Sequence, residues 1–331
     1  MDKRERLEST IAGYMTDRPP MALWRRFPGD DQRSADFAQA IIGFQQRYDW
    51  DFVNIAPADT YSLTDYGLQT TWTGRSDGNR TIVKHVVQSS LDWTELRTQD
   101  PTRGEFARVI EAIRLVSAEL GPNVPLLVTV YSPLSQAARL AKAPLMHRHL
   151  RTRPERLMSG LSTLTESTLR FINALARTPI SGICYVVEQA DQDVLSAAEY
   201  QAFGTAYDQK ILSELASDWW FNLLHLRGQS PLFEMLQDYP LQAVNWSFTD
   251  GKPSLAQGKS LLRGAVCGGV SQSDLHLSTP AVLRNTVREV ALRVNKRRLI
   301  LSADGAAPVT TPLSNLQAIR DATQQLTKGT F

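Results

Sequence analysis

The chain has 331 residues, of which 42% are hydrophobic and 21% are charged, a composition typical of a globular protein with a sizeable core. Its 36 Lys and Arg residues nearly balance its 34 Asp and Glu residues, so the formal charge of +2 favours neither a nucleic acid nor an anionic membrane as partner. The two cysteines, Cys184 and Cys267, exclude a disulfide framework, and no apolar run approaches the length of a membrane span. We therefore expect a cytoplasmic protein.

Short apolar runs of strand length alternate along the chain with longer amphipathic runs of helix length. In chain order, the expected strands are residues 20–26, 51–58, 124–132, 181–189, 220–228, 242–248, 264–270 and 298–304. The expected helices that follow them are residues 34–48, 103–120, 154–176, 197–216, 231–237, 255–262, 280–294 and 312–326. This alternation is the pattern of parallel βαβ units, and eight such units predict an α/β fold of the (β/α)8 or TIM-barrel type.

Two segments stand outside this repeat. Residues 1–18 are charged and helical in pattern, which predicts an N-terminal helical extension. The insertion at residues 67–92 contains Asp-Gly-Asn between β-rich segments, which predicts a hairpin laid over the barrel mouth. Because no linker or internal repeat divides the chain, we expect a single barrel domain over residues 1–331.

Barrels of this type carry their chemistry where the strands end and polar residues begin. The catalytic candidates at these positions are Asp59, His225 and Arg227, and the substrate-binding candidates are Arg25, Arg26, Tyr131, Gln189, Trp246 and Asp304. The arginines could form a guanidinium cluster that grips carboxylates or a phosphate in a bidentate manner. The sequence therefore predicts an anionic small molecule as substrate.

Each candidate also has a purely structural interpretation. His225 and Arg227 point the same way on a period-two strand, so His225 is either an acid or hydrogen-bond donor or an ordinary core histidine. Asp59 would stabilise positive charge beside arginines, or would serve as a loop or capping aspartate. Asp304 precedes Gly305 and could equally mark a turn, and any of the arginines could form a surface salt bridge.

Several short motifs occur together in a fixed order along nearly the whole chain. They are "LWRRFPGDDQ", "DYGL", "YSPLSQAARLA", "LHLRG", "AVNWSF", "GAVCGGV" and "TPLSNLQAI". In these motifs the chain resembles the uroporphyrinogen decarboxylase family, a barrel superfamily that also contains corrinoid- and thiol-dependent methyltransferases. The resemblance implies a TIM barrel and a homodimer with its mouths facing.

The resemblance also implies ligands that this chain only partly has. The methyltransferase branch binds zinc through a His-x-Cys on the fifth strand and a cysteine after the eighth; His225 matches the histidine, but Arg227 and Gly305 stand at the cysteines. Since an arginine does not ligate zinc, we expect no metal and no other cofactor. In the decarboxylase branch, Arg25 matches the first substrate-binding arginine and Asp59 matches the central aspartate after a one-residue slip.

The functional prediction is a metal-independent acid/base enzyme that decarboxylates a carboxylate-bearing small molecule such as a tetrapyrrole. One alternative is a methyltransferase of the corrinoid or thiol type with a degenerate zinc site, which would need a corrinoid protein as partner. Another alternative is a non-catalytic barrel that binds an anionic ligand.

Overall fold

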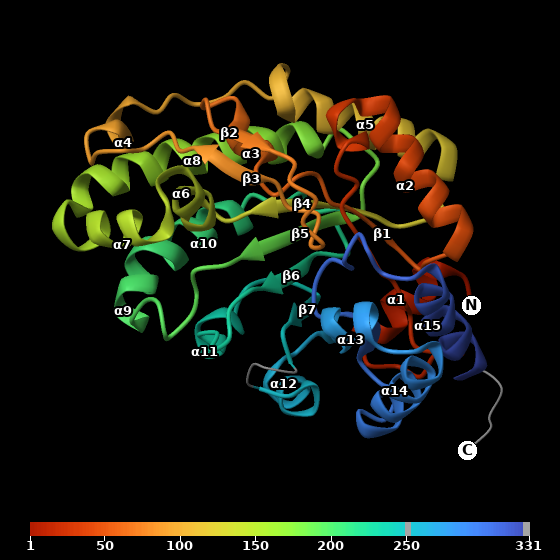
Figure 1. Ribbon diagram of the computed structural model, residues 1–331. Helices are drawn as coiled ribbons and strands as arrows, with labels where there is room; N and C mark the ends of the chain where they lie inside the picture. Colours follow the sequence, from red (N-terminus) through yellow and green to blue (C-terminus); the bar gives the residue numbers. More distant parts are fainter. Residues whose placement is uncertain (249–252, 327–331) are drawn as a thin grey trace.

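The computed structural model describes residues 1–248 and 253–326 and has a curled parallel sheet at its centre (Figure 1). The seven strands lie in the order β1-β4-β5-β6-β7-β8-β9, and each neighbouring pair is parallel. They are β1 (Val53–Ile55), β4 (Leu126–Tyr131), β5 (Gly182–Val187), β6 (Leu223–Leu226), β7 (Ala243–Trp246), β8 (Ala265–Val270) and β9 (Leu299–Ala303). Every residue of these strands is buried, as expected for a parallel sheet covered on both faces.

The eighth strand position is filled by residues 20–26, although they do not form a continuous strand. Two isolated parallel bridges join Met21 to Leu301 and Arg25 to Ala307, and the Asp51 amide donates to the Met21 carbonyl on the other side at 2.8 Å. The segment therefore lies between β9 and β1 and completes the TIM-barrel arrangement. The expected strand at 20–26 is wrong in detail, because Pro19 and Pro20 lack the amide protons that a regular ladder needs.

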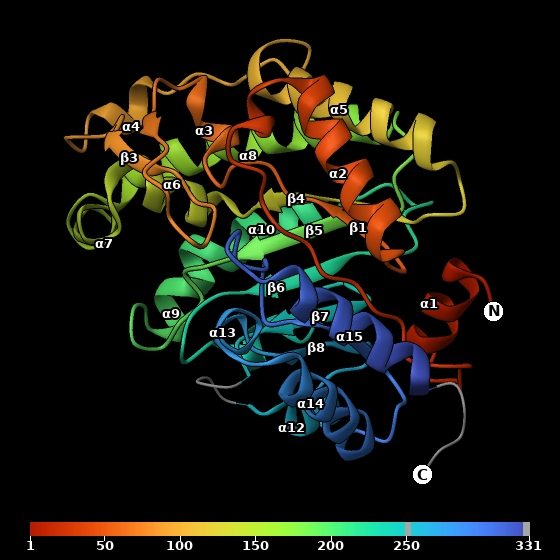
Figure 2. The same ribbon diagram turned by 45° about the vertical axis from the view of Figure 1, so that its right-hand side comes forward.

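Helices cover the outside of the barrel, and most match the predicted ranges to within two residues. The long helices are α2 (Ser34–Tyr48), α5 (Gly104–Leu120), α8 (Pro154–Leu175), α14 (Pro280–Arg293) and α15 (Leu313–Gln325). The shorter ones are α1 (Lys3–Ile11), α3 (Tyr61–Thr64), α4 (Asp92–Glu95), α6 (Pro133–Ala141), α7 (Ala143–Thr152), α9 (Ala197–Tyr200), α10 (Ala206–Leu212), α11 (Phe233–Leu236), α12 (Leu255–Leu261) and α13 (Gln272–Leu277), with a 3₁₀ turn at Asp30–Gln32. Figure 2 shows α2 beside α5 and α14 beside α15.

Local sequence explains where these helices begin, end and face. In α2 the buried residues recur every three or four positions, which gives the helix one apolar face toward the barrel. It ends at Asp49, which adopts the left-handed conformation with φ of 52°. The helix expected over residues 197–216 is instead interrupted by a π-helical turn at Gln201–Thr205, and the predicted N-terminal extension is helical only over Lys3–Ile11.

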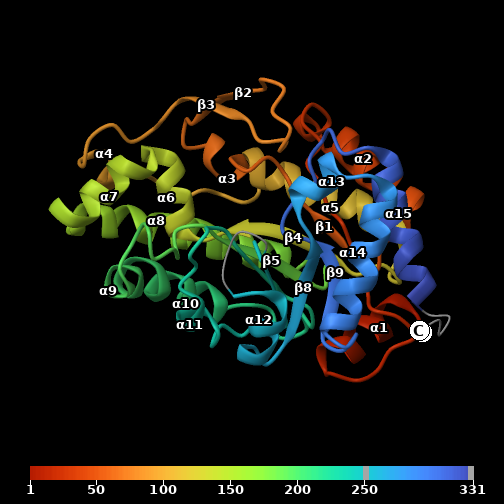
Figure 3. The same ribbon diagram turned by 60° about the horizontal axis from the view of Figure 1, so that its bottom comes forward.

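The insertion at residues 67–92 contains the predicted hairpin. Strands β2 (Gln69–Thr71) and β3 (Thr81–Lys84) pair antiparallel, and Figure 3 shows the hairpin and α1 at opposite sides of the molecule. Gly78 in the turn has φ of +73°, and a Cβ there would lie 2.9 Å from the Cβ of Arg26. The hairpin turn thus packs directly on the end of the first barrel segment. Within the described residues, no helix is long and apolar enough to cross a membrane.

Candidate active site

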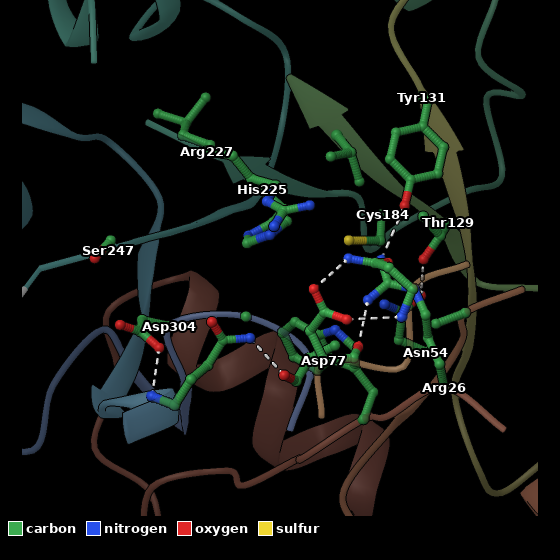
Figure 4. Close-up of a pocket in the computed structure, with 18 of the residues that line it drawn as sticks. Arg26, Asn54, Asp77, Thr129, Tyr131, Cys184, His225, Arg227, Ser247 and Asp304 are labelled. Carbon is green, nitrogen blue, oxygen red and sulfur yellow. Dashed lines mark hydrogen bonds between the residues drawn. The ribbon is translucent and has the colours of Figure 1, made fainter. Parts of the chain in front are cut away.

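A cavity of about 340 Å³ opens at the carboxyl ends of the barrel strands (Figure 4). Its wall includes Asn54 from β1, Thr129 and Tyr131 from β4, Cys184 from β5 and His225 from β6. The hairpin turn adds Asp77 and Asn79 to the rim. The cavity therefore lies at the end of the barrel where such proteins bind their ligands. The hairpin turn forms part of its wall.

The structure brings together five of the nine residues predicted for the site. These are Arg26, Tyr131, His225, Arg227 and Asp304, which all line the cavity. Figure 4 shows them converging from separate elements of the barrel mouth. Asp304 accepts a hydrogen bond from the Gln272 amide at 2.8 Å, which ties it to the start of α13.

The other four predicted residues do not line this cavity. The Arg25 side chain donates to the Val309 carbonyl and its guanidinium lies 5.4 Å from the Phe27 ring centroid. The Gln189 amide contacts a ring nitrogen of His147 at 2.9 Å. The indole of Trp246 is fully buried and donates to a backbone carbonyl. These three side chains are therefore not part of the cavity wall, and their role in substrate binding stays a prediction.

Asp59, the fourth of these, belongs to a buried ion-pair network behind the cavity wall. Its carboxylate lies 3.5 Å from Nε of Arg139, whose terminal nitrogens also grip both carboxylate oxygens of Glu188. Glu188 in turn accepts a hydrogen bond from Arg227 at 2.9 Å. The guanidinium of Arg139 stacks 4.5 Å from the Tyr131 ring centroid. Glu188 thus holds Arg227 at the cavity and links it to Asp59.

Arg26 differs from these arginines because it has no carboxylate partner among the described residues. Only 8% of it is exposed, and it donates to the Asp77 carbonyl at 3.3 Å and to the Tyr131 hydroxyl at 3.1 Å. Its Nε is buried without any partner. A buried guanidinium that lacks a counter-ion is costly, so this part of the cavity is prepared for an anion.

His225 is buried on β6 opposite Asn245 of β7. Burial, reinforced by the charge of Arg227, lowers the pKa of His225 from 6.5 to about 4, so the imidazole is neutral at physiological pH. Its Nδ1 has no hydrogen-bond partner in the described part of the chain. A neutral ring with a free nitrogen can exchange a proton with a bound ligand, which is the acid/base chemistry that a histidine supplies.

The residues around His225 do not fit a zinc site. A Cβ placed on Gly305 would lie 3.5 Å from Cε1 of His225, so Gly305 is adjacent to the ring but offers no donor atom. Arg227, two residues along the strand, supplies a fixed positive charge instead of a thiolate. Residues 1–248 and 253–326 contain no cluster of three His, Cys, Asp or Glu side chains arranged to hold a metal.

The cysteines do not replace the missing thiolates. Cys184 lines the cavity, whereas Cys267 is buried beneath it in β8. Burial raises the pKa of both thiols, that of Cys267 to about 12, and keeps them protonated. Neither is therefore suited to act as a nucleophile or metal ligand.

Sequence reasoning missed three residues that shape the site: Asn54, Arg139 and Glu188. Asn54 and Glu188 each lie within or next to a predicted strand, where a polar residue in an otherwise apolar run signals a side chain that faces the barrel interior. Arg139 lies on α6, about two turns beyond Ser132, whose hydroxyl caps the helix. Its role depends on three-dimensional contacts that the sequence does not display.

A parallel barrel with a polar cavity at the carboxyl ends of its strands defines the class of α/β-barrel enzymes. Within that class, the chain belongs to the uroporphyrinogen decarboxylase (URO-D) family, whose model matches residues 31–326.

Its relatives by sequence are named as methyltransferases. The chain is 21% identical over 305 residues to the methylcobamide:CoM methyltransferase MtbA of Methanosarcina acetivorans, a match that covers 89% of this chain and 85% of the relative. It is 23% identical over 249 residues to MtaA of Methanosarcina barkeri, with 74% and 71% covered.

Solved structures give the same picture of the fold. A methyltransferase from Methanosarcina mazei superposes with a TM-score of 0.82 at 19% identity, covering 98% of this chain and 99% of the other. A B12-independent methionine synthase from Shewanella superposes with a TM-score of 0.58 at 14% identity, covering 89% and 87%. At these identities the structural likeness shows a shared fold.

Proposed function

We propose that this protein is a methyltransferase of the URO-D family that acts on a small anionic molecule and uses Arg227 and His225 where related enzymes place a metal. The observation that carries the proposal is the Arg227 guanidinium, fixed by Glu188 at the cavity beside a neutral His225. The named relatives support methyl transfer over decarboxylation. The cavity of about 340 Å³ also favours a compact ligand over a tetrapyrrole, since it lies at the lower end of ligand pockets, which span roughly 300–1,000 Å³.

The residues suggest how a methyl acceptor would be activated. A thiol or hydroxyl must lose its proton before it attacks a methyl group. The neutral imidazole of His225 can accept a hydrogen bond from the acceptor and orient it, but its low pKa makes it a weak base, so the proton would pass to solvent. The positive charge of Arg227 stabilises the anion that remains on the acceptor. The methyl donor would be a methylated corrinoid, by analogy with the relatives named methylcobamide methyltransferases, and a corrinoid protein is then the expected partner.

The test is a methyl-transfer assay with methylcobalamin as donor and CoM or other small thiols as acceptors, followed by the absorbance change of the corrinoid. We expect turnover that is insensitive to chelators and that falls about 100-fold or more in Arg227→Gln, the usual effect of removing one group that stabilises developing charge. Stoichiometric zinc in the active protein, or no transfer from methylcobalamin to any thiol, would contradict the proposal. Arg170→Gln, at an exposed arginine paired with Glu166 on α8, is the control variant.

A further inference from the structure

One side of the cavity presents hydrogen-bond donors that the protein itself leaves unused. Arg26, Asn54 and Tyr131 come from three neighbouring elements of the barrel, namely the first segment, β1 and β4. None of the three is more than 8% exposed. We call these three residues the donor cluster.

The hydrogen bonds of Tyr131 show in which direction its hydroxyl must donate. The oxygen accepts a bond from Arg26 at 3.1 Å, and a guanidinium has no acceptor to offer in return. No second hydrogen bond to this hydroxyl is found in the described part of the chain. Burial raises the pKa of Tyr131, so the proton is retained and remains available to a ligand in the cavity.

Asn54 has a similar imbalance. Its Oδ1 accepts a hydrogen bond from the Thr129 hydroxyl at 3.2 Å, whereas its Nδ2 is buried without a partner. Nε of Arg26 is the third unsatisfied donor, and the guanidinium forms no ion pair among the described residues, although the charge of Asp59 acts on it from a greater distance. Buried donors without partners are rare and cost free energy in the empty protein, so three of them along one cavity wall indicate a missing acceptor.

We infer that the donor cluster is an oxyanion subsite that binds a carboxylate of the substrate. A carboxylate accepts several hydrogen bonds through its two oxygens, and its negative charge would lie against a guanidinium that forms no ion pair among the described residues. The opposite part of the cavity, with His225 and Arg227, then faces the rest of the molecule. The inference rests on the proposed function in taking this cavity as the substrate site, and it names the substrate as a small monocarboxylate at that end.

The experiment is calorimetric titration of the full-length protein with acetate and propionate, with methanesulfonate and acetamide as comparison ligands. We expect the carboxylates to bind wild type and the neutral amide not to bind. Tyr131→Phe removes one hydroxyl and should weaken carboxylate binding about tenfold to a hundredfold, the equivalent of one hydrogen bond to a charged group. Asn54→Asp replaces the donor by an anion, and Arg26→Met removes the charge; each should abolish binding.

Tyr66→Phe is the matched control for Tyr131→Phe, because the Tyr66 hydroxyl bonds Ser167 elsewhere in the molecule. Asn54→Leu keeps the side-chain size and should weaken binding less than Asn54→Asp. Circular dichroism confirms that each variant is folded. The subsite would be overturned if acetate and acetamide bound equally, if methanesulfonate were preferred, or if no carboxylate bound to wild type. Unchanged affinity in Tyr131→Phe and Asn54→Leu would also overturn it. If carboxylates bind but no methyl transfer is measured, the inferred subsite is still supported and only the proposed methyltransferase function is overturned.

Discussion

Two buried arginines at opposite ends of the barrel, Arg6 and Arg26, differ in how their charge is paired. At the amino-terminal end, Asp51 pairs with both Arg6 and Arg18 at 2.6 Å and accepts the Met21 amide at 2.7 Å. At the carboxyl end, Arg26 is buried to a similar degree and has no carboxylate partner among the described residues. The Asp51 ion pairs join segments that are far apart in the chain, whereas Nε of Arg26 has no partner among the described residues. Ion pairing, rather than burial, therefore separates the two arginines, and it is the reason why we propose a binding role for Arg26.

The largest effect is expected at the paired end. Asp51→Asn leaves Arg6 and Arg18 without their shared counter-ion, and breaking such a buried pair typically costs about 3–5 kcal/mol of the free energy of unfolding. Urea denaturation measures this loss. Asp100→Asn, at an exposed aspartate near Arg103, should leave the urea midpoint close to that of wild type, because solvent screens the pair. Equal losses of stability in the two variants would show that the Asp51 ion pairs do not stabilise the fold more than an exposed pair does.

The pH dependence of stability should report His225 at the carboxyl end. Its pKa of about 4 in the folded protein lies below the ordinary 6.5, so between these values the unfolded chain binds a proton that the folded protein does not. Stability should therefore fall as the pH drops from about 6.5 to 4, by up to about 1.4 kcal/mol per pH unit. Urea midpoints across this range should show a shallower slope for His225→Asn than for wild type. Parallel slopes would show that His225 does not titrate as described.

A smaller effect is expected when the neighbouring charge is removed. Burial is the main cause of the low pKa of His225 and Arg227 is the second, so Arg227→Gln should raise that pKa only part of the way toward its ordinary value. Histidine NMR titration measures the change directly. Arg170→Gln, at an exposed arginine on α8, should leave the pKa of His225 unaltered, and an equal shift in both variants would argue against a local effect of Arg227.

The smallest stability change is expected at the unpaired arginine. Arg26→Met removes a buried charge that forms no ion pair among the described residues, so the free energy of unfolding should stay within about 1 kcal/mol of wild type or rise. The same denaturation experiment tests this value. A loss comparable with that of Asp51→Asn would show that Arg26 is a structural residue like Arg6.

The sequence predicted the architecture well because the alternation of apolar and amphipathic runs, and the length of each run, can be recognised without any knowledge of tertiary contacts. Seven of the eight expected strands and the hairpin are present, and most helix ends agree within two residues. The exceptions have local causes: consecutive prolines interrupt the first strand, and a π-helical turn divides the helix expected at 197–216.

The site was less predictable because several predicted residues have a sequence neighbour that lies closer to it. Of the two predicted arginines Arg25 and Arg26, only Arg26 lines the cavity, and Ser247 lines it where Trp246 was predicted. Gln189 follows Glu188, which belongs to the ion-pair network that holds Arg227. A one-residue shift along a strand exchanges the two faces. In a parallel barrel both faces are apolar, so the sequence has no alternation that fixes which residues point inward.

The most direct test of the central claim, that the carboxyl-end cavity binds a small anion through Arg26, is a crystal structure of the protein soaked in propionate. The account predicts a carboxylate within hydrogen-bond distance of Arg26, Asn54 and Tyr131, with its alkyl end toward His225. Water alone beside Arg26, with propionate absent or bound outside the cavity, would contradict it.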